Sequence, residues 1–299
     1  MNFSKKQNAF QLSPIVHGHW RLNEWHYSAQ KLLALTQQLI ELGVTSFDHA
    51  DIYGDYTCEN LFGKAIKLKP AIRQNIQIVS KCGIKLMSDK YPDRKIKYYD
   101  YNRDHILHSA ENSLKNLHTD YLDLLLLHRP SPFFNPEEVA AAFSELKRSG
   151  KVRHFGVSNF NPAQFDMLES FTDEKLVTNQ VEISPAHLEH FENGNIDFFL
   201  KNKIRPMAWS PVAGGRLFHG RDDKYKRIRD CVKTIAKKEN TSPTKIIYAW
   251  LFNHPARIIP IVGSGKLSRI KAAVEAQVIN LSVEDWLRIY NASQGKDLP

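Results

Sequence analysis

The sequence contains few cysteines. Cys58, Cys82 and Cys231 are the three that occur among 299 residues, and no two of them form a C-x-x-C pair. This number and spacing argue against a disulfide framework or a thiolate zinc site, and they are typical of a protein from a reducing compartment.

Long apolar segments are also lacking. The densest apolar run, residues 122–127, is far shorter than the ~20 residues needed to span a bilayer, and Asp123 interrupts it. Residues 1–7 are polar and lack the apolar core of a signal peptide. The sequence therefore predicts a soluble cytoplasmic protein with no membrane partner.

Acidic residues are fewer than basic ones. The chain has 41 Lys and Arg against 32 Asp and Glu, a formal charge of +9 and a pI near 9.3. Such a surplus is typical of proteins that bind nucleic acid, an acidic membrane or an anionic small molecule. No continuous basic stretch with interleaved aromatic residues occurs, which argues against nucleic acid. With 42% apolar residues the chain can bury a full core, so it is not disordered.

Short β-rich runs alternate with stretches whose apolar residues recur every three or four positions, a pattern typical of helices. Alternation of this kind favours either a (β/α)₈ barrel or a doubly wound sheet. The length, and the absence of G-x-G-x-x-G after any β-rich run, favour the α/β (β/α)₈ TIM barrel. No linker interrupts the pattern, so residues 1–299 are expected to form a single domain. The β-rich runs are residues 14–20, 46–50, 76–82, 121–128, 152–158, 177–183, 205–210 and 258–263.

Residues at several helix ends and in two long loops add local predictions. Gly150 is expected to end a helix, and Ser242 before Pro243 to begin one. Ser282, with Asp285 three residues later, resembles a capping box. The polar stretches 84–103 and 212–223 are too long for plain turns and are expected to be active-site loops.

Reactive residues follow three neighbouring β-rich runs, where a barrel places its catalytic groups. Asp48, Tyr53, Lys81 and His128 all lie at such positions. A lysine ammonium favours the phenolate of a nearby tyrosine and lowers its pKa, while an aspartate can hold the lysine in place. With a histidine donating to a carbonyl oxygen, this group can protonate an oxyanion as a hydride arrives at carbon.

Each of these residues also has a structural explanation. Asp48 can begin a helix, Tyr53 can be a half-buried aromatic residue, and Lys81 can extend its stem along apolar surface. His128, after an apolar run, can be a hydrogen-bonded core histidine.

Six segments in order, together with their spacing, resemble the aldo-keto reductase superfamily, and the sequence is most similar to a bacterial oxidoreductase branch of it. The resemblance extends from residue 18 to residue 269. The segments are 47–54 (FDHADIYG), 78–81 (IVSK), 123–128 (DLLLLH), 156–160 (GVSNF), 179–182 (NQVE) and 209–211 (WSP).

The resemblance implies NADPH-dependent reduction of an aldehyde or ketone to an alcohol. It implies a catalytic set of Asp48, Tyr53, Lys81 and His128, with Tyr53 as the proton donor. Further residues match positions that contact the nicotinamide half of the cofactor: Ser158, Asn159 and Gln180 on its carboxamide, and Trp209 with Ser210 beside its ring. Trp209 can also be a core aromatic residue. Trp20 and the two long loops are expected to contact the substrate.

The segment after the last β-rich run is expected to hold the phosphates of the cofactor. Glycines let backbone N–H groups approach phosphate, and a helix start adds its positive dipole. The resemblance places Arg269 on the 2′-phosphate of NADPH, which favours NADPH over NADH. Two residues depart from the family pattern: Ala273 replaces an adenine-contacting Asn, and His49 replaces a small Thr or Ser. The phosphate-binding set is Gly263, Ser264, Gly265, Lys266 and Arg269.

Two alternatives remain open. A metal-dependent barrel hydrolase is suggested by the H-x-H pair His17 and His19, with His128 and His187 as further ligands, although it leaves Tyr53 and Lys81 without a role. A regulatory barrel that binds the cofactor but turns over slowly is the other. The main prediction is a metal-free enzyme acting on a small carbonyl compound, as a monomer or weak oligomer.

The basic surplus lies in two segments. Residues 216–239 hold nine Lys or Arg and four Asp or Glu, and residues 256–271 hold four Lys or Arg and no acidic residue. Both flank the last two β-rich runs, where barrel enzymes often bind phosphate. The surplus is therefore interpreted as attraction toward a polyphosphate cofactor.

Overall fold

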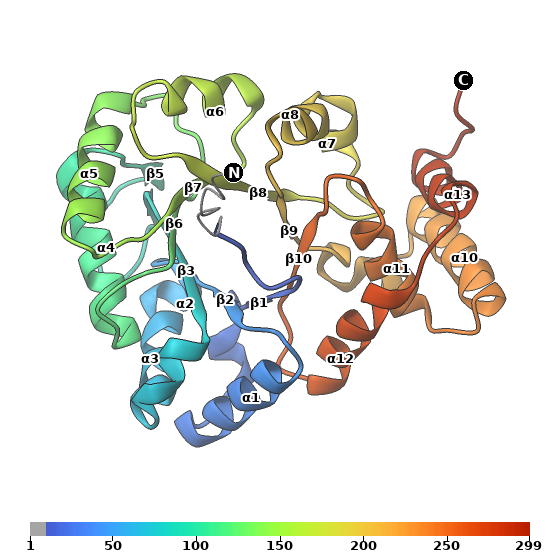
Figure 1. The fold of residues 1–299 in the computed structure, drawn as a ribbon, viewed down its shortest axis with the longest axis horizontal. Helices are drawn as coiled ribbons and strands as arrows, with labels where there is room; N and C mark the ends of the chain where they lie inside the picture. Colours follow the sequence, from blue (N-terminus) through green and yellow to red (C-terminus); the bar gives the residue numbers. More distant parts are fainter. Residues whose placement is uncertain (1–9) are drawn as a thin grey trace, which may run out of the picture.

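A computed structural model describes residues 10–299, and residues 1–9, where the sequence predicts no signal-peptide core, lie outside the described part. Eight parallel strands close into a barrel in the order β1-β10-β9-β8-β7-β6-β3-β2 (Figure 1). Each coincides with a predicted β-rich run, so the predicted (β/α)₈ barrel is confirmed. The strands are β1 (Val16–Gly18), β2 (Ser46–Asp48), β3 (Gln77–Cys82), β6 (Leu124–Leu127), β7 (Phe155–Ser158), β8 (Leu176–Glu182), β9 (Met207–Trp209) and β10 (Ile259–Val262).

Alternation along each strand divides the apolar residues into an inner and an outer set. In β6, Leu124 and Leu126 pack inside the barrel with Val79, whereas Leu125 and Leu127 pack outward under the helices. Lys81 follows Val79 by two residues and so points into the barrel as well. The apolar interior forms a floor beneath this lysine at the carboxyl ends of the strands.

Helices surround the barrel and cover its outer surface (Figure 1). Amphipathic spacing explains this cover, since their buried residues recur on one face. The α-helices are α1 (Ala29–Glu41), α2 (Tyr53–Tyr56), α3 (Cys58–Lys67), α4 (Arg103–Leu117), α5 (Pro136–Arg148), α6 (Pro162–Glu169), α7 (Glu189–Glu192), α8 (Asn195–Asn202), α9 (Arg216–His219), α10 (Asp223–Lys238), α11 (Pro243–Phe252), α12 (Leu267–Glu275) and α13 (Val283–Gln294). The 3₁₀ helices are η1 (Leu22–Trp25), η2 (Pro70–Asn75), η3 (Ala213–Gly215) and η4 (Ala276–Val278).

The predicted helix ends are largely as expected. The Ser242 side chain accepts from the Lys245 N–H ahead of α11, with Pro243 in the first helical position. Ser282 likewise caps α13 by accepting from Asp285 N–H. The helix α5 ends at Arg148, and Gly150, two residues later, lies in the left-handed region with φ 72°.

The two long loops contain structure that the sequence did not predict. Residues 84–103 form a hairpin of β4 (Ile84–Lys85) and β5 (Tyr98–Tyr99), and 212–223 contains η3 and α9. The hairpin begins at Gly83, where φ is +105° and a Cβ would lie 2.0 Å from the Tyr101 ring. Only glycine allows the chain to turn there.

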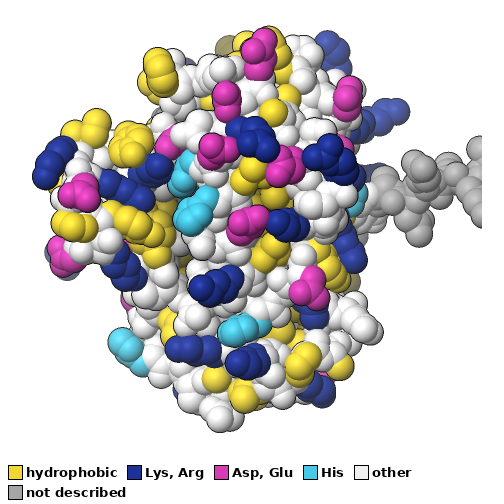
Figure 2. Space-filling model, turned by 90° about the vertical axis from the view of Figure 1, so that its left-hand side faces the viewer, with side chains coloured by type: hydrophobic (Ala, Val, Ile, Leu, Met, Phe, Trp, Pro, Cys, Tyr) yellow, Lys and Arg dark blue, Asp and Glu magenta, His cyan; other side chains and the backbone are white. Residues whose placement is uncertain are grey.

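On the face that α4 and α5 present, basic and acidic side chains lie among one another, with no continuous basic surface (Figure 2). The charge surplus is therefore not gathered on this side of the molecule. No helix within residues 10–299 is both long and apolar enough to cross a bilayer.

Candidate active site

Lys81 is the centre of a polar group inside the mouth of the barrel. Its Nζ lies 2.7 and 2.8 Å from the two carboxylate oxygens of Asp48, 2.7 Å from the His49 carbonyl oxygen and 3.0 Å from the Tyr53 hydroxyl. The side chains of Lys81 and Asp48 are 0% and 3% exposed. Strand register explains the meeting, since β2 pairs with β3 and Lys81 lies two residues beyond the partner of Asp48.

Tyr53 is placed by an unusual turn directly after it. Gly54 and Asp55 both have left-handed backbone angles within α2, with φ of 59° and 51°. A Cβ on Gly54 would lie 2.6 Å from Cys58 Sγ and 2.9 Å from Thr57 Oγ1. The glycine is therefore required both for its backbone angle and for lack of space, and it holds the tyrosine hydroxyl over Lys81.

His128 follows β6 directly and lies beside Tyr53. The two rings meet edge to face, with centroids 5.8 Å apart. Burial, with added repulsion from Lys81 and Arg129, holds the pKa of His128 well below its usual range. The imidazole is therefore neutral, a form in which one ring nitrogen donates a hydrogen bond and the other accepts one.

Burial determines the protonation state of Tyr53. The pKa of its hydroxyl is raised above the usual value because burial outweighs the opposing charge of Lys81, and Asp48 adds to the increase. Burial also disfavours the Lys81 ammonium, but Asp48 and Tyr53 more than offset this and raise the lysine pKa. At neutral pH the pair is a protonated phenol against a protonated amine, so Tyr53 is a proton donor in this state.

The residues predicted to contact a nicotinamide form one connected network at the ends of three further strands. Ser158 Oγ donates to the Gln180 carbonyl (2.8 Å), and Asn159 Nδ2 donates to Ser158 Oγ (2.8 Å). Trp209 Nε1 donates to Asn159 Oδ1 (3.0 Å). Trp209 is half-buried rather than a core residue, so part of its indole remains accessible.

Gln180 joins this network to the lysine group. Its Nε2 donates to Asp48 Oδ1 over 2.8 Å, across the interior of the barrel. Sequence reasoning did not find this contact, because the two residues are 132 positions apart and nothing in either segment indicates the other. The Asp48 carboxylate thus accepts three hydrogen bonds, two from Lys81 Nζ and one from Gln180 Nε2, which fix its orientation.

The segment between β10 and α12 suits a phosphate-bearing ligand. Its glycines and Lys266 precede α12, and no side chain within the described residues caps this helix. The N–H groups of Leu267 and Ser268 are therefore available to an anion, whereas Arg269 N–H donates to the Lys266 carbonyl, and the helix dipole adds to the attraction. Arg269 is exposed in the first turn, as a phosphate-binding guanidinium requires. These residues fit the phosphate end of a nicotinamide dinucleotide.

Other predicted residues occupy varied positions. Trp20 is 60% exposed just beyond β1. Ser210 has a φ of 51° and its carbonyl accepts from Ala213 N–H. Ala273 belongs to α12 and is fully buried against the core.

The three histidines near β1 and β2 form a buried cluster. His19 Nδ1 and His49 Nε2 are 3.0 Å apart, and His17 Nε2 lies 3.0 Å from the Ser264 carbonyl oxygen. His49 thus turns toward His19, and its contact with the lysine group is made by its carbonyl. Burial lowers the pKa of His17 to about 4, and those of the other two well below their usual value.

This geometry gives the metal-dependent hydrolase no support. One ring nitrogen of each histidine in the H-x-H pair makes a contact within the protein, while His17 Nδ1 and His19 Nε2 are buried with no hydrogen-bond partner in the described structure. Across residues 10–299, no three His, Cys, Asp or Glu side chains are grouped so that they could hold a metal ion.

Two further acids, Asp51 and Glu59, lie near Lys81. Ser109 Oγ donates to Asp51 Oδ2 and Ser80 Oγ donates to Glu59 Oε1, each over 2.6 Å. The remaining oxygen of each carboxyl is buried and has no hydrogen-bond partner in the described structure. Burial raises the pKa of Glu59, and it raises that of Asp51 to about 7. Asp51 therefore titrates near neutral pH.

Replacement of Asp51 with asparagine is expected to change how stability depends on pH. An unfolded Asp51 loses its proton near pH 4 and the folded one near pH 7, so between these values the folded protein binds more protons. Wild-type stability then falls as pH rises through this window, by at most about 4 kcal/mol from this group. Thermal melts from pH 4.5 to pH 8 measure the slope, which D51N should reduce.

Asp285→Asn is the matched control. The Lys238 hydrogen bond lowers the pKa of Asp285 despite its burial, so this carboxyl titrates below the window and its loss should leave the slope unchanged. Equal slopes for D51N and the wild type would contradict the assignment to Asp51.

Comparison with known proteins agrees with this architecture. The model of the Aldo/keto reductase family matches residues 14–294. The chain belongs to the aldo-keto reductase family. As a member of that family it is an NAD(P)H-dependent oxidoreductase, and the resemblance seen in the sequence is confirmed.

The similar relatives are bacterial oxidoreductases. The chain is 51% identical to the uncharacterized oxidoreductase YcsN of Bacillus subtilis, over 97% of both chains. It is 48% identical to the oxidoreductase YdhF of Escherichia coli, over 97% of this chain and 96% of that one. A 6-dehydroglucose reductase of Agrobacterium fabrum is 38% identical over 96% of both.

Solved structures show the same barrel. An aldo-keto reductase of Klebsiella pneumoniae in complex with NADPH has a TM-score of 0.76 and 26% identity, over 93% of this chain and 90% of that one. The thermostable aldo-keto reductase Tm1743 has a TM-score of 0.81 and 28% identity, over 96% of this chain and 97% of that one.

Proposed function

We propose that this aldo-keto reductase reduces an aldehyde or ketone to the alcohol with NADPH, and that Tyr53 donates the proton. The observation that carries the proposal is the position of the Tyr53 hydroxyl, 3.0 Å from a Lys81 ammonium that Asp48 holds with both carboxylate oxygens. When bound, the cofactor supplies the hydride.

Each residue of the set has a separate task. Tyr53 gives its hydroxyl proton to the carbonyl oxygen as negative charge develops there. Lys81 stabilises the phenolate that remains, because its ammonium is already at hydrogen-bond distance and needs no rearrangement. Asp48 fixes the ammonium, and the neutral His128 donates a hydrogen bond to the substrate oxygen and orients it. The edge-to-face contact of His128 with Tyr53 places both donors on one side of the mouth.

The remaining residues are proposed to hold the cofactor. Ser158, Asn159 and Gln180 contact the carboxamide, and Trp209, with Ser210 next to it, contacts the nicotinamide ring. The loop of Gly263, Ser264, Gly265 and Lys266 binds the pyrophosphate through backbone N–H groups. Arg269 binds the 2′-phosphate, to which a guanidinium can donate two parallel hydrogen bonds. Trp20 contacts the substrate at the mouth.

Spectrophotometry of NADPH consumption with a panel of aldehydes and ketones tests the reaction. The panel includes 6-dehydroglucose, since the Agrobacterium fabrum relative is named for its reduction. We expect turnover with at least one carbonyl compound and formation of the alcohol. Tight NADPH binding without turnover on the whole panel would instead support a regulatory barrel.

The same assay, run with NADPH and NADH, tests the cofactor preference. Arg269→Ala should weaken NADPH binding by roughly 10–100-fold, as expected for a lost hydrogen-bonded charge pair, and leave NADH binding unchanged. Arg148→Ala, at the exposed end of α5, is the control of equal charge. An unchanged ratio of the two affinities in R269A would remove Arg269 from this role.

A further inference from the structure

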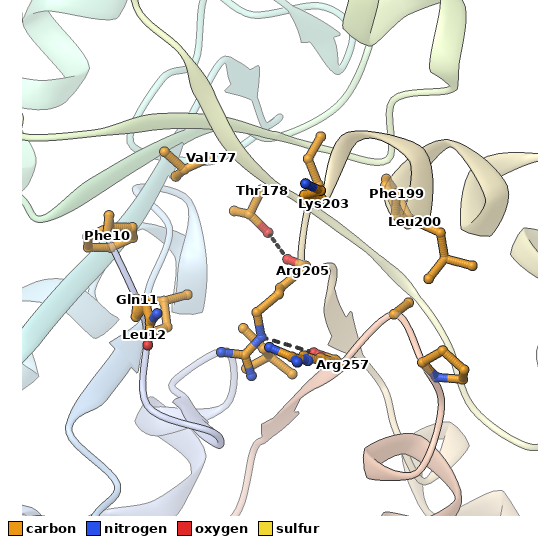
Figure 3. Close-up of a pocket in the computed structure, with 14 residues that line it drawn as sticks. Phe10, Gln11, Leu12, Val177, Thr178, Phe199, Leu200, Lys203, Arg205 and Arg257 are labelled. Carbon is orange, nitrogen blue, oxygen red and sulfur yellow. Dashed lines mark hydrogen bonds between the residues drawn. The ribbon is translucent and has the colours of Figure 1, made fainter. Parts of the chain in front are cut away.

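A pocket lies at the opposite end of the barrel from Tyr53. Its volume is about 430 Å³, within the usual range of small-molecule sites. Three of its residues precede the strand ends that form the candidate active site: Thr178 comes two residues before Gln180, Arg205 two before β9, and Arg257 two before β10. The segment 10–12 and the end of α8 complete the wall (Figure 3).

All the charged side chains that line this pocket are basic. Lys203, Arg205 and Arg257 line it, and none of its 14 lining residues is an Asp or Glu. None of the three cations belongs to an ion pair within the described residues. Positive charge is therefore concentrated in a concave space without a neutralising group.

Elsewhere in residues 10–299, thirteen Lys or Arg side chains pair with an acid, whereas the three that line the pocket do not. The two arginines also lie against each other, since Arg205 Nε donates to the Arg257 carbonyl over 3.2 Å. Burial, together with repulsion from Arg257, lowers the pKa of Arg205. An anion placed between them would relieve this repulsion.

The rest of the lining is apolar and held in place. Figure 3 shows the two arginine side chains between Phe10 and Leu12 on one side and Phe199 and Leu200 on the other. Thr178 Oγ1 donates to the Arg205 carbonyl over 2.8 Å, which fixes the backbone that carries the guanidinium. The pocket therefore offers both a head-group site and an apolar wall.

We propose that this pocket binds a small organic anion, with a phosphate or carboxylate head on Arg205 and Arg257 and an apolar body against the surrounding side chains. A planar guanidinium matches either oxyanion with two parallel hydrogen bonds. The site is separate from the candidate active site, because it lies at the starts of β8, β9 and β10 whereas the proposed cofactor contacts lie at their ends. The proposal does not depend on the reaction at Tyr53.

Isothermal titration calorimetry on the full chain, saturated with NADP⁺ to fill the proposed cofactor site, tests this binding. The probes are phenyl phosphate and benzoate, with inorganic phosphate as a head group alone and benzyl alcohol as a neutral ring. We expect phenyl phosphate or benzoate to bind more tightly than inorganic phosphate, and benzyl alcohol not to bind. The tighter of the two aromatic anions identifies the preferred head group.

Variants locate the site. Arg257→Gln, at an exposed residue, and Arg205→Gln should each weaken binding of the aromatic anion by roughly 10–100-fold, the usual effect of losing a charged hydrogen-bond donor. Arg257→Lys keeps the positive charge but cannot donate two parallel hydrogen bonds, so it should give an intermediate loss of affinity. Arg148→Gln on α5 makes the same charge change elsewhere and should bind as the wild type does. Unchanged affinity in both glutamine variants, or no binding of either aromatic anion to the NADP⁺-saturated protein, would overturn the proposal.

Discussion

Tyr53→Phe is expected to lower kcat for carbonyl reduction by about 10²–10⁴-fold, the usual contribution of a positioned general acid. The change removes one hydroxyl group and no carbon atom. Lys81 keeps its contacts with both Asp48 oxygens and the His49 carbonyl, so its ammonium is still satisfied. The fold and the cofactor affinity should therefore be preserved while the proton transfer is lost.

Single-turnover measurements with NADPH deuterated at the transferred position identify the step that is affected. The variant should show a larger isotope effect than the wild type, because hydride transfer then limits the rate. Tyr290→Phe is the matched control, since its hydroxyl contacts Glu192 near the end of the chain and its removal should leave kcat unchanged. Wild-type turnover by Y53F would show that another group supplies the proton.

The sequence predicted which residues surround Lys81, but it did not predict the direction in which the pKa of Tyr53 is shifted. It predicted that Lys81 lowers the pKa of Tyr53. The charge of Lys81 does act in that direction, but burial has the larger effect and the pKa is raised. The order of residues along a chain shows which groups meet at the mouth of a barrel. It does not show how completely the surrounding residues exclude water, and that exclusion decides the direction here.

The strands and their ends were predictable for a similar reason. Alternation of β-rich and helical runs is local, and in a barrel the carboxyl end of every strand lies at one face, so a residue such as His128 can be assigned from its position after Leu127. Contacts across the barrel were not predictable. The bond from Gln180 to Asp48 and the turn of His49 toward His19 depend on side-chain directions that no local pattern records. The β4–β5 hairpin was missed because its two-residue strands are too short to show alternation.

The structure divides the basic surplus into parts with different environments. On α10, Lys226 and Lys233 pair with acids one turn before them, and Lys238 bridges to Asp285 of α13. These charges belong to a solvated helix surface packed beside α13 (Figure 1). The proposed role in attracting a polyphosphate therefore applies to Lys266 and Arg269 near α12. Arg257, from the same basic segment, lies instead in the pocket at the far end of the barrel.

Lys81→Met is expected to have the largest effect on stability, a loss of about 3–5 kcal/mol, together with loss of the reaction. Removing one partner of a buried ion pair leaves the other charge without compensation. In this variant the Asp48 carboxylate would lose both hydrogen bonds from Lys81 and keep the one from Gln180 Nε2. Its side chain is 3% exposed, so water cannot replace the lost contacts. Guanidinium-induced unfolding, followed by tryptophan fluorescence, measures the loss.

The double variant Asp48→Asn with Lys81→Met separates the cost of the unpaired charge from the cost of altered packing. Asparagine is neutral and similar in size, so the double variant should recover much of the stability that Lys81→Met loses, while remaining inactive because Tyr53 has no ammonium to stabilise its phenolate. Lys226→Met is the control at the surface: its side chain is 57% exposed and that of its partner Asp223 is 84% exposed, so its loss should change stability little. If the double variant were no more stable than K81M, the loss would come from packing around the methionine and not from Asp48. Recovery of stability without recovery of turnover would instead mean that the ammonium of Lys81 is needed for the chemistry of Tyr53, and that Asp48 is needed to keep that ammonium in the interior of the barrel.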